Sequence, residues 1–160
     1  MAARVTRERG FGLGGAIING RTEPQGALAS GICSNSTTIF NAALRAGLQM
    51  GERRNHFNYI NRYPLGLDAT VFISGSGSTQ TMTFTNDTPC PILIRGRLAG
   101  GSKGYVRYEL FSVPTGRTVE FSDPIVKSVR KATTVTLESD ELRPGARGQP
   151  STPSTGRTSG

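Results

Sequence analysis

Three residues of the types that thiol chemistry requires follow one another in the first half of the chain. Cys33 comes first, His56 is the single histidine, and Asp68 comes after it. A cysteine nucleophile, a histidine base and a carboxylate that orients the imidazole are the three roles needed for attack on a carbonyl. The order therefore indicates acyl chemistry at Cys33. The alternative is that Cys33 is a small hydrophobic residue, that His56 is exposed and that Asp68 accepts turn hydrogen bonds.

Cys33 stands just before an expected helix. The residues from Ser34 to Ser36 supply N-cap chemistry, apolar residues then recur at helical spacing, and Gly47 is typical of a C-cap. The helix is expected over residues 36–46. Free N–H groups and the dipole at a helix start stabilise a thiolate and lower its pKa, so this position favours a nucleophilic cysteine.

Strand-like runs surround this helix. Period-2 alternation and β-branched residues predict strands at residues 15–20, 69–73, 79–85, 92–94, 105–111 and 117–121. The first run ends in an Asn19-Gly20 turn, and the second and third form a hairpin. The predicted fold class is therefore α+β, with a small, mainly antiparallel or mixed sheet packed against one principal helix.

The 160 residues are enough for one domain. Residues 1–9 are expected to be a disordered N-terminus, 10–126 the domain and 127–142 a strand-like extension. Residues 143–160 are rich in Gly, Pro, Ser, Thr and Arg and almost devoid of apolar side chains, which predicts a disordered basic tail or linker.

Scarcity in the composition excludes several kinds of site. One histidine and two cysteines cannot build a multi-histidine or cysteine-rich metal site, and we expect neither a metal nor a cofactor. Cys33 and Cys90 could form at most one disulfide. No apolar run is long enough to span a membrane, and no signal peptide is visible. The net charge of +8 makes an anionic neighbour plausible, but the basic residues are dispersed, so no stable nucleic-acid partner is expected.

Three blocks of sequence resemble the VanW-like family. Residues 30–48 read SGICSNSTTIFNAALRAGL, residues 52–56 read ERRNH and residues 63–71 read YPLGLDATV. The family patterns are approximately G-G-G-I-C-Q-V-S-T-T-L-F-N-A-A-L-R-A-G-L, E-R-H-P-H-S and Y-P-x-G-x-D-A-T-V. The blocks align the family's cysteine, second histidine and aspartate with Cys33, His56 and Asp68.

The resemblance implies a bacterial envelope protein, since members are typically anchored outside the cytoplasm, although the chain itself carries no visible anchor and looks like a truncated or minimal member. It departs from the pattern where Ser34 replaces a glutamine, Arg54 replaces the first histidine, and Ala29 and Ser30 replace two glycines. If the glutamine amide helps to bind an oxyanion, its loss at Ser34 would reduce activity.

Two functions follow as expectations. The first is a thiol-dependent hydrolase or acyltransferase that acts on an envelope peptide or amide through Cys33, His56 and Asp68. Other polar residues of the matching blocks are expected to bind substrate or support the site: Ser34, Ser36, Thr37, Asn41, Arg53 and Tyr63. The second is a non-catalytic module that binds peptidoglycan or another anionic wall polymer through arginines. The oligomeric state stays open.

Overall fold

A computed structural model describes residues 5–18, 21–57, 59–73, 78–101, 104–127 and 144–145, and of residues 16–18 and 21–27 only the backbone. The expected Asn19-Gly20 turn lies outside the described residues, as do almost all of the expected extension at 127–142 and of the tail at 143–160. Within the expected N-terminal segment, Arg7–Arg9 forms a short 3-10 helix, η2.

One helix, α1 (Ile32–Arg45), organises the described part of the chain. It begins four residues earlier than the sequence predicts, because the expected cap does not form: Gly31 is the N-cap and provides no side-chain hydrogen bond. The Ser36 hydroxyl instead donates to the carbonyl of Cys33 at 3.1 Å. The other end comes one residue earlier than expected, with Ala46 as the C-cap. Gly47 follows it with a φ of 70°, and its N–H donates to the Leu44 carbonyl.

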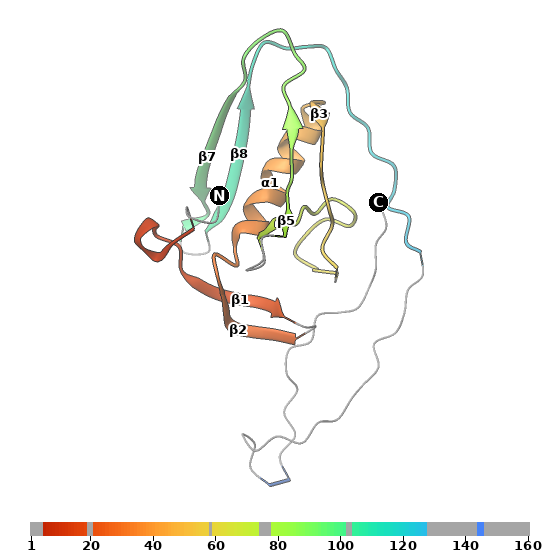
Figure 1. Cartoon of the computed structure of the whole chain (residues 1–160). Helices are drawn as coiled ribbons and strands as arrows, with labels where there is room; N and C mark the ends of the chain where they lie inside the picture. The colour runs from red at the N-terminus through yellow and green to blue at the C-terminus, as the bar shows by residue number, and fades with distance from the viewer. Residues whose placement is uncertain are drawn as a thin grey trace.

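The strands of the described residues pair into four separate two-stranded antiparallel sheets instead of the expected single sheet (Figure 1). The first pair is β1 (Leu13–Ile18) with β2 (Arg21–Leu28), with a bulge between Gly14 and Ala16. The remaining pairs are β3 (Gln49–Met50) with β6 (Phe84–Thr85), β4 (Phe72–Ile73) with β5 (Thr79–Gln80), and β7 (Leu93–Ala99) with β8 (Tyr105–Phe111). The α+β class is confirmed.

The run predicted as one strand over residues 79–85 is divided because it changes partner. Its first two residues pair with β4, whereas Thr83 exchanges backbone hydrogen bonds of 2.9 Å with Gly51 and Glu52. The hairpin of the predicted second and third strands is present only as the short β4–β5 pair.

The predicted strand at 117–121 does not form. Arg117 instead donates a hydrogen bond of 2.8 Å to Asp87 and another of 2.8 Å to the carbonyl of Gly47. Side-chain hydrogen bonds thus hold a segment for which the sequence predicted a backbone ladder.

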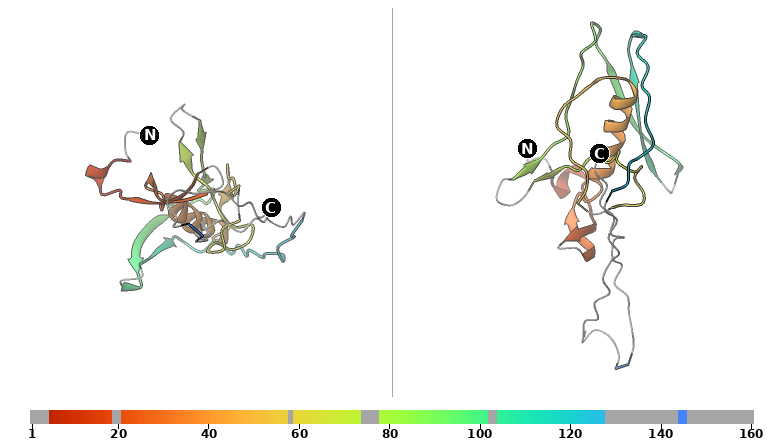
Figure 2. Two further views of the ribbon diagram at one scale, coloured as in Figure 1. Left: turned by 90° about the horizontal axis from the view of Figure 1, so that it is seen from below. Right: turned by 90° about the vertical axis from the view of Figure 1, so that its right-hand side faces the viewer.

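The core is small and lies on one side of α1. Its buried apolar residues are Phe40, Ala43, Leu48 and Ala69, and three polar residues are buried beside them: Ser36, Thr37 and Asp68. β8 packs against α1, and the strand pairs extend from the helix in different directions (Figure 2). No helix of the described residues has the length and apolar character needed to cross a membrane. Because buried polar residues form much of this core, the same packing that holds the fold also positions the candidate site.

Candidate active site

Cys33 lies in the first turn of α1, one residue inside the helix start. The sequence placed it just before the helix, and the earlier start moves it into the turn. Its thiol is partly buried and donates to the carbonyl oxygen of Val71 at 3.4 Å. This contact brings the helix start against the segment that follows Asp68. Both Cys33 and Cys90 are free thiols.

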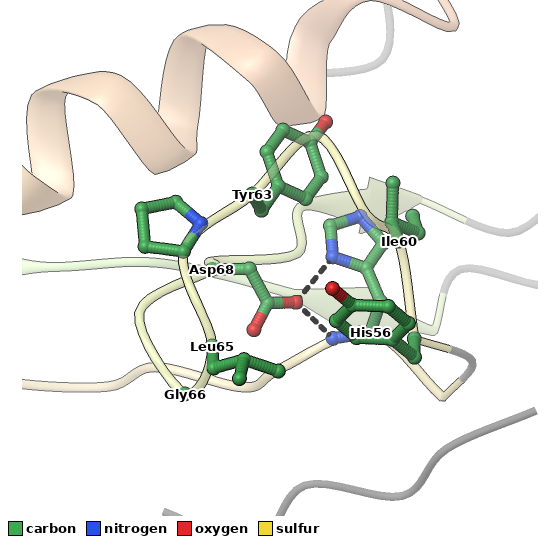
Figure 3. A pocket seen from close by; sticks show the side chains of 8 residues that line it. His56, Ile60, Tyr63, Leu65, Gly66 and Asp68 are labelled. Carbon is green, nitrogen blue, oxygen red and sulfur yellow. Dashed lines mark hydrogen bonds and ion pairs between the residues drawn. The ribbon is translucent and has the colours of Figure 1, made fainter. Parts of the chain in front are cut away.

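His56 and Asp68 form a tight pair (Figure 3), and His56 also forms a hydrogen bond with the side chain of Cys33. The Nδ1 atom of His56 lies 2.6 Å from Oδ2 of Asp68, and the backbone N–H of His56 donates to the same oxygen at 2.7 Å. An ionised carboxylate can only accept, so Nδ1 carries the proton of this bond. The imidazole therefore keeps its Nε2 atom for another partner.

The electrostatics of Cys33 and His56 are coupled. Burial raises the pKa of the Cys33 thiol, but a hydrogen bond with His56 and the charges of His56 and Arg62 bring it below its ordinary value. Burial lowers the pKa of His56, whereas hydrogen bonds with Asp68 and Cys33 raise it to about 9. Both shifts favour a thiolate beside an imidazolium.

Asp68 is held on both of its oxygens. Its side chain is 11% exposed, and Oδ1 lies 3.6 Å from Nη2 of Arg53. Arg53 also donates from Nε to the Asp68 carbonyl at 2.8 Å and from Nη2 to the Gly66 carbonyl at 2.5 Å. Burial raises the pKa of Asp68, but the hydrogen bonds and charge of His56 bring it below its ordinary value. Arg53 thus fixes the chain around a carboxylate that stays ionised.

Three side chains of α1 fasten this segment to the helix. The Ser36 hydroxyl donates to the Ala69 carbonyl, and Thr37 Oγ1 accepts from the Ala69 N–H at 3.0 Å. One turn further, Asn41 donates from Nδ2 to the Leu67 carbonyl at 2.7 Å and to the Thr37 carbonyl at 2.8 Å. These bonds set the distance between the helix that carries Cys33 and the segment that carries Asp68.

Tyr63 and Ser34 close the site around the imidazole. The Tyr63 ring stacks on His56 with centroids 5.2 Å apart and an interplanar angle of 27°. Its hydroxyl lies 3.0 Å from the hydroxyl of Ser34, the residue next to Cys33. Ser34 therefore binds Tyr63 at the position where the family pattern has a glutamine. All six residues expected to support the site lie around Cys33, His56 and Asp68.

The helix start offers one backbone donor beside the thiol. The N–H groups of Ser34 and Asn35 both donate to the Gly31 carbonyl, at 3.0 and 3.4 Å. The structure gives the amide of Cys33 no hydrogen-bond partner among the residues it describes. That amide is therefore the group of this turn with a free proton for a developing oxyanion.

A pocket opens beside the pair of His56 and Asp68 (Figure 3). The other residues that line it are Tyr59, Ile60, Tyr63, Pro64, Leu65 and Gly66. Sequence analysis did not single out Tyr59 or Ile60, because an aromatic and an aliphatic residue in a loop carry no chemical signature. Their place between His56 and Tyr63 in the chain was the one available signal. The described residues contain no group of three or more His, Cys, Asp or Glu side chains that could hold a metal ion.

Comparison with known proteins supports the family resemblance that the sequence blocks indicated. A family model described as VanW like protein matches residues 1–110, which confirms the resemblance drawn from the sequence. The uncharacterized protein YoaR of Bacillus subtilis (strain 168) is 39% identical over 97 residues, which are 61% of this chain and 30% of YoaR. The chain thus spans less than two thirds of the length of this relative. No solved structure matches the chain.

Proposed function

This chain belongs to the VanW-like family, and we propose that it is a thiol-dependent enzyme that acts on a peptide or amide of the bacterial cell envelope. The observation that carries the proposal is the convergence of Cys33, His56 and Asp68, with Nδ1 of His56 2.6 Å from the carboxylate. The three residues come from separate parts of the chain. A buried carboxylate, an oriented imidazole and a thiol of lowered pKa are what nucleophilic catalysis by cysteine requires.

The reaction assigns one role to each residue. The Cys33 thiolate attacks the carbonyl carbon, and the oxyanion that forms accepts a hydrogen bond from the Cys33 amide. The C–N bond then breaks, and the His56 imidazolium gives its proton to the leaving amine, which leaves a thioester on Cys33. His56 next removes a proton from water or from an acceptor amine, whose attack releases the acid or a new amide. Asp68 remains ionised throughout.

The presence of Ser34 at the position of the family's glutamine affects the expected rate of this reaction. Its hydroxyl is engaged with Tyr63 at 3.0 Å, so it does not replace the amide of the family's glutamine as a free donor. With one backbone donor instead of a backbone and a side-chain donor, the oxyanion is stabilised less. We therefore expect a slow enzyme, and we expect Ser34→Gln to raise its rate.

Site-resolved alkylation tests the proposal. The rate of iodoacetamide reaction at Cys33 is measured by mass spectrometry from pH 5 to 10, with Cys90 of the same chain as the reference thiol. The expected inflection at Cys33 lies below the free-thiol value of about 8.5 and moves upward in His56→Ala. An inflection near 8.5 in both proteins would show that Cys33 is an ordinary buried thiol.

A second candidate function has its own observation, on the hairpin of β7 and β8. Arg95, Arg97 and Arg107 share one face, are about half exposed, and converge on the single carboxylate of Glu109 at 2.6, 3.4 and 3.1 Å. One face thus carries three positive charges against one negative charge. This excess supports a non-catalytic module that binds peptidoglycan or an anionic wall polymer.

Sedimentation with purified peptidoglycan separates the two functions. The binding module predicts binding that falls steeply with added salt, survives Cys33→Ala and is lost when the three hairpin arginines become glutamine. Binding that is indifferent to salt, or that depends on Cys33 while the fold is retained, would contradict it.

A further inference from the structure

Arg62 lies at the edge of the candidate site. Its Cζ atom is 5.5 Å from the centroid of the Tyr63 ring, the same ring that stacks on His56 at 5.2 Å. The ring of Tyr63 therefore contacts both the imidazole of His56 and the guanidinium of Arg62. The charge of Arg62 also acts on the Cys33 thiol. Burial raises the pKa of this thiol, the hydrogen bond with His56 lowers it, and the charges of His56 and Arg62 lower it further.

The guanidinium of Arg62 forms no ion pair with a carboxylate within the described part of the chain. Five described arginines have carboxylate partners: Arg53 has Asp68, Arg117 has Asp87, and the three hairpin arginines have Glu109. Among the described residues, Arg62 shares the lack of such a partner with exposed arginines such as Arg45 and Arg54, and differs from them in lying beside the candidate site. No described carboxylate pairs with Arg62, and its side chain is exposed. A guanidinium that lies over an aromatic ring can still donate through the N–H groups at its edge. A planar carboxylate can accept two of these hydrogen bonds at once.

Arg62 lies outside the lining of the small pocket beside the site, next to Tyr63, which is part of that lining. Tyr59, Ile60, Tyr63, Pro64, Leu65 and Gly66 are neutral, and the carboxylate of Asp68 is already engaged by His56 and Arg53.

We propose that Arg62 is the anion-binding residue of this site, and that the substrate carries a carboxylate close to the carbonyl that Cys33 attacks. This inference rests on the proposed thiol chemistry and adds a substrate class to it. The guanidinium holds the carboxylate over Tyr63 and thereby orients the reacting carbonyl toward Cys33. Arg62 is thus a specificity-determining residue.

Two alkylating reagents of nearly equal size test the charge alone. Iodoacetate and iodoacetamide both react by attack of the thiolate on the CH₂ carbon with loss of iodide, and they differ in carrying a carboxylate or a neutral amide. The quantity measured is the ratio of their rates at Cys33 in the intact chain at pH 7, by mass spectrometry of the cysteine-containing peptides. The same ratio at Cys90 reports the general attraction of a basic protein for an anion.

Arg62→Gln is compared with Arg45→Gln as the matched control. Arg45 also lies over an aromatic ring, that of Phe121 at 4.8 Å, but at the opposite end of α1 from Cys33. We expect the iodoacetate-to-iodoacetamide ratio at Cys33 to fall about three- to tenfold in Arg62→Gln and to stay unchanged in Arg45→Gln. In the unsubstituted protein, raising the salt concentration should lower the ratio.

The outcomes separate this inference from the proposed function. If Cys33 reacts rapidly with both reagents and Arg62→Gln lowers the ratio no more than Arg45→Gln, the carboxylate site is wrong and the thiol chemistry stands. If Cys33 resists both reagents as Cys90 does, the proposed function fails and this inference fails with it. Equal urea midpoints for the two variants establish that the fold is intact.

Discussion

A single oxygen of Asp68 accepts two hydrogen bonds from His56, one from the backbone N–H at 2.7 Å and one from Nδ1 of the ring at 2.6 Å. The first bond fixes where His56 lies along the chain, and the second fixes how its ring is turned. Because both bonds end on one atom, the carboxylate determines the position, the tautomer and the charge of the imidazole together. Any change at Asp68 is therefore transmitted to Cys33 through His56.

Asp68→Asn tests this transmission. The amide keeps the shape of the side chain and loses its charge, so burial is no longer offset by the carboxylate and the pKa of His56 falls from about 9. The neutral imidazole then stabilises the Cys33 thiolate less. We expect the rate of Cys33 alkylation at pH 7 to fall severalfold, because a smaller fraction of the thiol is ionised. Asp87→Asn is the control, since Asp87 pairs with Arg117 outside the site, and an equal fall in both variants would contradict the prediction.

The sequence singled out reactive residues more readily than the contacts that hold them in place. Cys33, His56 and Asp68 carry reactive groups, so residue type and order alone singled them out. Arg53 and Tyr63 act through contacts with residues 13 or more positions away or through ring stacking, which no local pattern encodes. The start of α1 was misplaced for a related reason: Ser34 and Ser36 have the right chemistry for a cap, but tertiary contacts with Tyr63 and Ala69 engage their hydroxyls.

Strand prediction failed where pairing depends on distant segments. Period-2 alternation correctly predicted β8, a long strand with one partner. The same alternation could not show that residues 79–85 divide between two partners, because alternation specifies faces and not neighbours. The end of α1 was predictable because Gly47 satisfies a local requirement, a backbone φ of 70°.

The free energy of unfolding should depend on pH through the ionisation of His56 and Cys33. The pKa of His56 is raised to about 9 in the folded state, so its stabilising contribution is complete below about 6.5 and is lost as the pH rises toward 9. The lowered pKa of Cys33 has the opposite sign, because a thiolate formed on folding gains stability as the pH rises. In the unsubstituted protein the two contributions therefore oppose each other as the pH rises above 6.5.

Cys33→Ser removes one of the two terms. We expect the free energy of unfolding of this variant to decline more steeply between pH 6.5 and 9 than that of the unsubstituted protein. Urea titrations at pH 6, 7, 8 and 9 measure the difference. At acid pH both proteins should lose stability in parallel below about pH 4, since protonation of Asp68, whose folded pKa is depressed, removes its bonds with His56. Parallel curves between pH 6.5 and 9 would count against the coupled thiolate and imidazolium.

The contact between Ser34 and Tyr63 predicts an energetic coupling. Tyr63→Phe removes the hydroxyl that lies 3.0 Å from Ser34 and keeps the ring that stacks on His56. We expect Tyr63→Phe, Ser34→Ala and the double variant to destabilise by similar amounts, with a coupling energy of about 0.5–1.5 kcal/mol. The alkylation inflection at Cys33 should not move in Tyr63→Phe. Strictly additive effects in a double-mutant cycle would mean that this hydrogen bond is not formed in solution.

Thr37 and Thr38 provide a matched pair for testing how α1 holds the segment of Asp68. Thr37 Oγ1 is buried and accepts from the Ala69 N–H at 3.0 Å, whereas Thr38 Oγ1 donates at 2.7 Å to the Ser34 carbonyl within its own helix. Thr37→Val keeps the volume and branching of the side chain but leaves the buried Ala69 N–H without its acceptor, which costs about 1–3 kcal/mol. Thr38→Val breaks no contact between segments and should change stability by less than about 0.5 kcal/mol. Because Ala69 adjoins Asp68, Thr37→Val should also slow Cys33 alkylation while Thr38→Val does not. Equal urea midpoints for the two variants would show that the helix and this segment are held together by other contacts.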